Sequence, residues 1–198
     1  MVDVGDVLIH TSNGAQYHEL ARRTGLHPQG VAQLVEASGL PHALECGEIA
    51  DVEFIDAVRE LLSWTRLTRQ DVWQSWAAVL VGIEPIVAGV VARWAAEHRL
   101  VLASNTNALH WPVVCRMLEQ AGITAPAFLS FQMGVTKPDP RFFARIIDDD
   151  PSWYASAHFV DDRLDNVAAA TACGFDGWLH RDPVATAAFL SAVLADTS

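Results

Sequence analysis

Residues 157–166 have the sequence AHFVDDRLDN, in which a short apolar run ends in two adjacent acids. The apolar run predicts a buried strand over 157–160, and the pattern after it predicts a helix over 164–173. Asp161 and Asp162 then lie at the carboxyl end of the strand, where open α/β sheets bind their ligands. Two adjacent carboxylates repel each other unless a cation lies near them. The stretch therefore predicts a site for Mg²⁺, which binds carboxylates together with waters and substrate oxygens.

Three further polar clusters follow apolar runs in the same way. Asp3 follows the first apolar residues of the chain. Ser104 and Asn105 end a strand predicted over 100–103. Lys137 stands before a proline, which favours an extended backbone at the lysine. Parallel strands bring their carboxyl ends to one edge of a sheet, so these groups can converge on the acid pair. A carboxylate nucleophile, a hydroxyl, an amine and a metal site together predict metal-assisted phosphoryl chemistry.

Each cluster alone has a simpler structural explanation. An aspartate near a turn, an asparagine that caps a helix, a solvated surface lysine and acids at a helix start are all common in proteins without any catalytic role. The functional interpretation depends on the four clusters occurring together and in order.

The rest of the pattern predicts an α/β protein in two parts. From residue 84 onward, helices alternate with strands, which indicates a doubly wound parallel sheet with helices on both faces. Before that, residues 12–82 show only helical periodicity, which predicts a helical cap inserted after the first strand and lying over the strand ends. We therefore expect a core of residues 1–11 and 83–198 and a cap of residues 12–82. Packing of these early helices on one face of the sheet is the alternative.

The segments predicted after the first strand (2–9, with its loop) are helices 16–23, 27–37, 52–64, 68–79, 84–97, 112–120, 140–147, 164–173 and 183–194, and strands 100–103, 127–129, 157–160 and 177–179.

Composition limits the partners. The chain has 24 acidic and 13 basic residues, a formal charge of −11, and no basic cluster, which disfavours nucleic acid and anionic membranes as partners. The first residues lack a basic leader, and no apolar stretch is long enough to span a membrane, so we expect a cytoplasmic protein. Three widely spaced cysteines fit reduced thiols better than disulfides or a zinc site.

Taken together, the motifs resemble those of the haloacid dehalogenase (HAD) superfamily of Mg²⁺-dependent phosphohydrolases, whose members have a Rossmann-like core. The matching segments are DVGDVL at 3–8, LASNTN at 102–107, GVTKPDP at 134–140 and FVDDRLDN at 159–166. With GEIADVEF at 47–54 and SNTNALHW at 104–111, they resemble the branch of bacterial sugar-1-phosphate phosphatases and the phosphatase domain of soluble epoxide hydrolases. The predicted helical cap is similar to the family's cap of the first type.

The resemblance implies a role for each matched residue. Asp3 would be the nucleophile, phosphorylated in turnover, and a metal ligand together with the backbone carbonyl of Gly5 and the carboxylate of Asp162. Asp161 and Asn166 would act through metal-bound water. The transferring phosphoryl group would be bound by Ser104, Asn105 and Lys137. The implied substrate is a small phosphorylated metabolite, and the implied assembly is a monomer or a homodimer.

Two features depart from the family pattern. Most phosphatases of the superfamily carry a second aspartate, the general acid and base, where this chain has Gly5. Loss of such a group lowers the rate roughly 10²–10⁴-fold, which corresponds to an activation barrier higher by about 3–5 kcal/mol, unless another group replaces it. Only Met1 and Val2 precede Asp3, so we expect either that the given start is late or that the first strand is short and the site looser than usual. Candidate replacements for the acid and base are Asp6, His10, His18 and His42, or a substrate such as an anomeric or acyl phosphate, whose leaving group needs little protonation.

Two other functions are compatible with these motifs. A non-catalytic HAD-like protein that binds a phosphorylated ligand or a partner chain would tolerate Gly5 and the short strand. A dehalogenase acting on 2-haloacids would also lack the second aspartate. Such an enzyme works without metal, however, and would have no use for two mutually repelling acids at 161 and 162.

Overall fold

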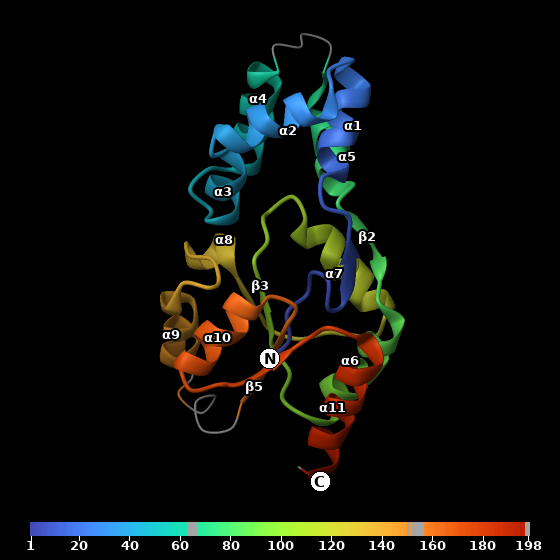
Figure 1. Cartoon of the computed structure of the whole chain (residues 1–198), viewed down its shortest axis with the longest axis vertical. Helices are drawn as coiled ribbons and strands as arrows, with labels where there is room; N and C mark the ends of the chain where they lie inside the picture. Colours follow the sequence, from blue (N-terminus) through green and yellow to red (C-terminus); the bar gives the residue numbers. More distant parts are fainter. Residues whose placement is uncertain (63–66, 150, 152–156, 197–198) are drawn as a thin grey trace.

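The core of the molecule is a parallel sheet in the spatial order β4, β3, residues 1–3, β5, β6. The computed structural model describes residues 1–62, 67–149, 151 and 157–196 (Figure 1). The strands are β3 (Leu102–Ser104), β4 (Ala127–Leu129), β5 (His158–Asp161) and β6 (Asp176–Leu179). The α/β class with a parallel sheet is therefore confirmed.

The first three residues occupy the centre of this sheet although they form only a minimal strand. Val2 makes parallel bridges to both neighbouring strands. Its amide donates to the Val101 carbonyl at 3.0 Å, and the Asp3 amide donates to the Val160 carbonyl at 2.8 Å. The short strand is therefore hydrogen-bonded on both sides, and Asp3 lies between the ends of β3 and β5.

Successive side chains of each strand point to opposite faces of the sheet, and helices cover both of these faces. Val2, Leu102 and Val160 pack into one hydrophobic cluster with side chains of α6 (Pro85–Glu97), α7 (Trp111–Gln120) and α11 (Pro183–Asp196). Their sequence neighbours in the strands, among them Met1, Val101 and Phe159, pack into a second cluster with α9 (Pro140–Asp149) and α10 (Leu164–Ala172). Burial on both faces is what the doubly wound arrangement requires.

The early helices gather at one end of the molecule, away from α6 and α11 (Figure 1). Their buried side chains, including Leu20, Phe54 and Val72, form a third hydrophobic cluster that is separate from the two sheet faces. This finding favours a helical cap over helices packed on the sheet. The helices are α1 (Ala15–Thr24), α2 (Pro28–Ala37), α3 (Leu40–Glu45), α4 (Asp51–Leu61) and α5 (Arg69–Ala77).

Two strands that the sequence did not predict connect these helices to the core. β1 (Ile9–Thr11) pairs antiparallel with β2 (Leu80–Ile83). The sequence predicted a strand and its following loop over residues 2–9, and the structure has this order, with a turn of positive φ at Asp6, except that Ile9 already belongs to β1. β2 was missed because its four residues continue the apolar pattern of α5, and its partner lies about 70 positions away.

The other boundaries agree with the predicted ones to within a few residues. The helices α3 and α8 (Ser130–Met133) were missed because they are too short to show a period. The predicted helix end at Trp64 lies outside the described residues. Among the described residues, no helix combines the length and apolar character needed to cross a membrane.

The cap contacts the core through a glycine. Helix α3 packs against α8 of the core, and Gly47 lies two residues after the end of α3. Gly47 has a φ of +66°, and a Cβ built on it would lie 2.0 Å from the Phe131 carbonyl oxygen of α8. Both the backbone conformation and the space at this contact therefore require glycine.

We expect Gly47→Ala to lower the free energy of unfolding by at least about 2 kcal/mol, because the new methyl group overlaps backbone atoms in a left-handed conformation. The matched control is Gly30→Ala in α2, where no atom lies within 4 Å of the added Cβ. The control should be neutral or stabilising by about 0.5–1 kcal/mol. Urea unfolding of both variants measures the difference, and equal effects would contradict the close contact at Gly47.

Candidate active site

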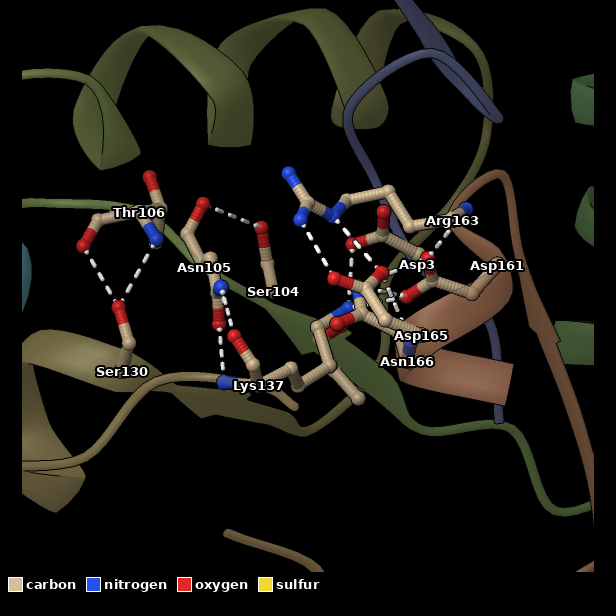
Figure 2. A network of polar contacts seen from close by, with 11 residues as sticks. Asp3, Ser104, Asn105, Thr106, Ser130, Lys137, Asp161, Arg163, Asp165 and Asn166 are labelled. Carbon is tan, nitrogen blue, oxygen red and sulfur yellow. Dashed lines mark hydrogen bonds and ion pairs between the residues drawn. The ribbon is translucent and has the colours of Figure 1, made fainter. Parts of the chain in front are cut away.

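Lys137 lies at the centre of the site. Its side chain is only 1% exposed, and its ammonium donates to Asp3 Oδ1 at 2.9 Å, to Asp161 Oδ2 at 2.6 Å and to the Ala103 carbonyl at 2.7 Å (Figure 2). All three donors of the ammonium are thus used. These bonds join the ends of β3, the central strand and β5 through one nitrogen atom. Lys137 is also the only lysine in the chain, a signal that sequence reasoning overlooked.

Asn105 holds the backbone of Lys137 in place. Its side-chain amide donates to the Lys137 carbonyl, and its Oδ1 accepts from the Lys137 amide, both at 2.8 Å. Ser104, the last residue of β3, is buried, and its hydroxyl makes only a long contact of 3.4 Å with the Asn105 carbonyl. The Asn105 side chain therefore orients the lysine, whereas the Ser104 hydroxyl has no strong partner among the contacts the structure describes.

The two adjacent acids differ in their surroundings. Asp161 is fully buried and accepts from Lys137, from Asn166 Nδ2 at 2.9 and 3.1 Å, and from the Arg163 amide at 2.9 Å (Figure 2). Asp162 is half-buried, and the described contacts include no side-chain hydrogen bond or ion pair for its carboxylate. Burial, and then repulsion by Asp161 and Asp6, raise the pKa of Asp162.

Three carboxylates converge here without enough positive charge. Oxygens of Asp3, Asp161 and Asp162 lie within 4.8 Å of one another. Burial, and then the charge of Asp161, raise the pKa of Asp3 to about 7 although Lys137 opposes this. One ammonium cannot balance three carboxylates, and a second cation would remove the penalty. The all-oxygen donor set fits a hard divalent ion such as Mg²⁺.

Gly5 is not required by the backbone or by the space around it. Its φ is not in the left-handed region, and a Cβ at this position would meet only Thr11 Cγ2, at 3.8 Å. A Cβ at this position would therefore fit without a clash. The absence of a carboxylate at this position is a chemical difference from the family pattern rather than a steric necessity.

A cavity of about 330 Å³ lies between the cap helices and the strand ends. Core residues on its wall include Gly5, Ser104 and Asn105. Asp6, His10, His18 and His42, which the sequence offered as replacement acids or bases, do not line it. The Asp6 carboxylate instead accepts from the amide and hydroxyl of Thr11, both at 2.8 Å.

The cap wall of the cavity contains residues that sequence reasoning did not identify. Its ionisable members are Tyr17, Glu36 and Glu45, and His110 of the core faces the same space. These residues come from separate helices and share no motif, so only the tertiary structure brings them together.

The fold is that of HAD-family enzymes. A search against protein-family models finds no match. A HAD family enzyme from Bacteroides thetaiotaomicron, solved in complex with magnesium and inorganic phosphate, is 23% identical with a TM-score of 0.78, covering 91% of this chain and 92% of that one. A predicted HAD-like family hydrolase from Porphyromonas gingivalis is 24% identical with a TM-score of 0.79, covering 98% and 95%. An L-2-haloacid dehalogenase from Xanthobacter autotrophicus is more distant, at 17% identity and a TM-score of 0.56, covering 89% and 74%.

We expect Lys137→Met to lower the free energy of unfolding by about 3–5 kcal/mol at pH 7, because it leaves buried carboxylates without their counter-charge. The loss should shrink as the pH falls toward 5, because an unpaired buried carboxyl binds a proton more readily when folded than when unfolded. Denaturant unfolding at both pH values measures this.

The control for this variant is Arg22→Met at an exposed ion pair with Glu19, which should leave the stability nearly unchanged. A Lys137→Met protein as stable as the control would show that the buried ion pairs are not formed as described.

Proposed function

We propose that the chain is a Mg²⁺-dependent hydrolase of the HAD family, and specifically a phosphatase of a small phosphorylated metabolite. The observation that carries this proposal is the buried Asp3–Lys137–Asp161 arrangement with Asp162 beside it, at the carboxyl ends of adjacent parallel strands. The Bacteroides enzyme with magnesium and inorganic phosphate in its structure supports the same chemistry, since it shares the fold.

In the proposed reaction, the Asp3 carboxylate attacks phosphorus and forms an aspartyl phosphate, which water then hydrolyses. Lys137 holds one Asp3 oxygen at 2.9 Å and balances part of the incoming negative charge. We assign the binding of phosphoryl oxygens to the Ser104 hydroxyl and the Asn105 backbone amide. Mg²⁺, when bound, supplies positive charge to the phosphate oxygens and offsets their repulsion from the carboxylates.

We assign the metal ligands to Asp3, the Gly5 carbonyl and Asp162. Asp161 is less suited to direct ligation because Lys137, Asn166 and the Arg163 amide already donate to it. We therefore propose that Asp161 and Asn166 act through metal-bound water. In support, Asn166 Oδ1 is buried without a hydrogen-bond partner in the described part of the chain, and water would satisfy it.

The proposal includes the division of the chain into a core of 1–11 and 83–198 and a cap of 12–82 that closes the cavity. It also includes a cytoplasmic location and a monomeric or homodimeric assembly.

Among the alternatives, a metal-independent 2-haloacid dehalogenase is disfavoured because Asp162 would stay an uncompensated acid beside Asp161. A non-catalytic binding protein would hold phosphate and Mg²⁺ without turnover.

We expect the protein to release phosphate from aryl phosphates in the presence of Mg²⁺, and we expect EDTA to abolish this activity. Asp3→Asn should reduce turnover by at least about 10³-fold because an amide cannot act as the nucleophile. Phosphate release measured for both proteins tests this, and activity that survives in the variant would refute the aspartyl-phosphate mechanism. Tight vanadate binding by the unmodified protein without any turnover would support the non-catalytic alternative.

The two adjacent acids should respond differently to removal of charge. Asp162→Asn should raise the Mg²⁺ concentration needed for half-maximal activity by about 10-fold or more while leaving the free energy of unfolding nearly unchanged, because its carboxylate binds metal rather than protein. Asp161→Asn should instead lower stability by about 1–3 kcal/mol, because it breaks buried hydrogen bonds. Mg²⁺ titrations and urea unfolding separate the two roles, and the opposite pattern would exchange the assignments.

A further inference from the structure

The proposed reaction needs a proton donor that the core does not supply. An alkoxide is a poor leaving group, so the ester oxygen must gain a proton as its bond to phosphorus breaks. Gly5 has no side chain to deliver it. The cavity beside Gly5 and Ser104 has four ionisable groups on its wall, and these are the candidates for the donor.

Three of the four ionisable groups on that wall are already engaged. Asn107 Nδ2 lies 3.1 Å from His110 Nδ1, and His110 Nε2 lies 3.0 Å from the Trp76 carbonyl, so the ring is held as a neutral imidazole with both nitrogens used. Burial lowers the pKa of His110, consistent with this state. The Tyr17 hydroxyl donates to the Glu36 carboxylate.

Glu45 is the remaining group. It is the last residue of α3 and lines the cavity together with Gly5 and Ser104. The described contacts include no hydrogen bond to its carboxyl group. Its turn is held against the core two residues later, where Gly47 meets Phe131. The charged neighbours that act on Glu45 are His42 of its own helix, Glu36 of α2 and Arg163 of the core.

The surroundings of Glu45 favour its neutral form. Burial raises its pKa, and Glu36 adds to this effect against the opposing influence of His42 and Arg163. A carboxylic acid that keeps its proton closer to neutral pH is suited to give the proton to a leaving group.

We infer that Glu45, from the cap, is the general acid and base that replaces the aspartate missing at position 5. This inference rests on the proposed phosphatase function. In the first step, Asp3 forms a bond to phosphorus, the bond from phosphorus to the ester oxygen breaks with its electron pair on oxygen, and that oxygen takes the Glu45 proton. In the second step, the Glu45 carboxylate takes a proton from water as the water oxygen bonds to phosphorus. The bond between Asp3 and phosphorus then breaks, which restores the Asp3 carboxylate and releases phosphate.

The deciding experiment compares two leaving groups in the intact protein with saturating Mg²⁺. Glycerol 2-phosphate releases an alkoxide that needs a proton, whereas 4-nitrophenyl phosphate releases a phenolate that does not. We expect Glu45→Gln to slow phosphate release from glycerol 2-phosphate by about 10²–10⁴-fold. With 4-nitrophenyl phosphate, the rapid initial burst of nitrophenolate should keep its rate to within about tenfold, while the later steady-state rate falls because water attack lacks its base.

Two further variants make the result specific. Glu48→Gln changes an exposed carboxyl on the turn after α3 and should leave the ratio of rates on the two substrates near that of the unmodified protein. Gly5→Asp introduces a carboxyl at a position where a Cβ meets no close contact. In the Glu45→Gln protein, this second substitution should raise the rate on glycerol 2-phosphate at least about tenfold.

The outcomes separate this inference from the proposed function. Equal losses on both substrates in Glu45→Gln, no loss at all, or no recovery on adding Gly5→Asp would overturn the role of Glu45 while leaving the phosphatase proposal intact. Absence of Asp3-dependent phosphate release in the unmodified protein would overturn both.

Discussion

The structure of the site depends on one buried ammonium group. Lys137 donates to Asp3, Asp161 and the end of β3, and these partners come from three adjacent strands of the sheet. Two carboxylates at the centre of a protein would each carry a large desolvation cost without this counter-charge. A compact ammonium with three donors suits three acceptors that converge on one point, whereas the planar fork of an arginine does not. Twelve of the thirteen basic residues are arginines, so the chain has its one lysine at the position where this geometry is needed.

The same interaction leaves the site short of positive charge. With Asp162 included, three carboxylates share one ammonium, and the raised pKa values of Asp3 and Asp162 reflect this imbalance. The imbalance favours binding of a hard cation and a phosphate group together. Because Asp161 is held by its protein partners and Asp162 is not, we propose orientation as the task of Asp161 and metal binding as that of Asp162.

The cap completes the site in a different way. Its helices have their own hydrophobic cluster, so they pack with one another and meet the core over a limited contact. The glycine contact between α3 and α8 fixes the cap at the turn that carries Glu45. A proton donor on the cap would link catalysis to the position of the cap over the cavity, because the acid would be in place only when the cap is docked.

The sequence by itself determined the fold class, the parallel sheet and the residues that converge on its edge. Strand ends and helix periods are local patterns, and polar residues such as Asp3 and Lys137 stand where those patterns stop. Only the tertiary structure decided the antiparallel pair β1 and β2, whose strands are far apart in sequence, and the short helices α3 and α8, which are too brief to show a period. It alone also brought Glu45 to the cavity wall and left Asp6 and the three candidate histidines off that wall, because the position of a cap side chain depends on how separate helices pack. The missing carboxylate at Gly5 was visible in the sequence, whereas a candidate replacement appeared only when the cap was placed over the sheet.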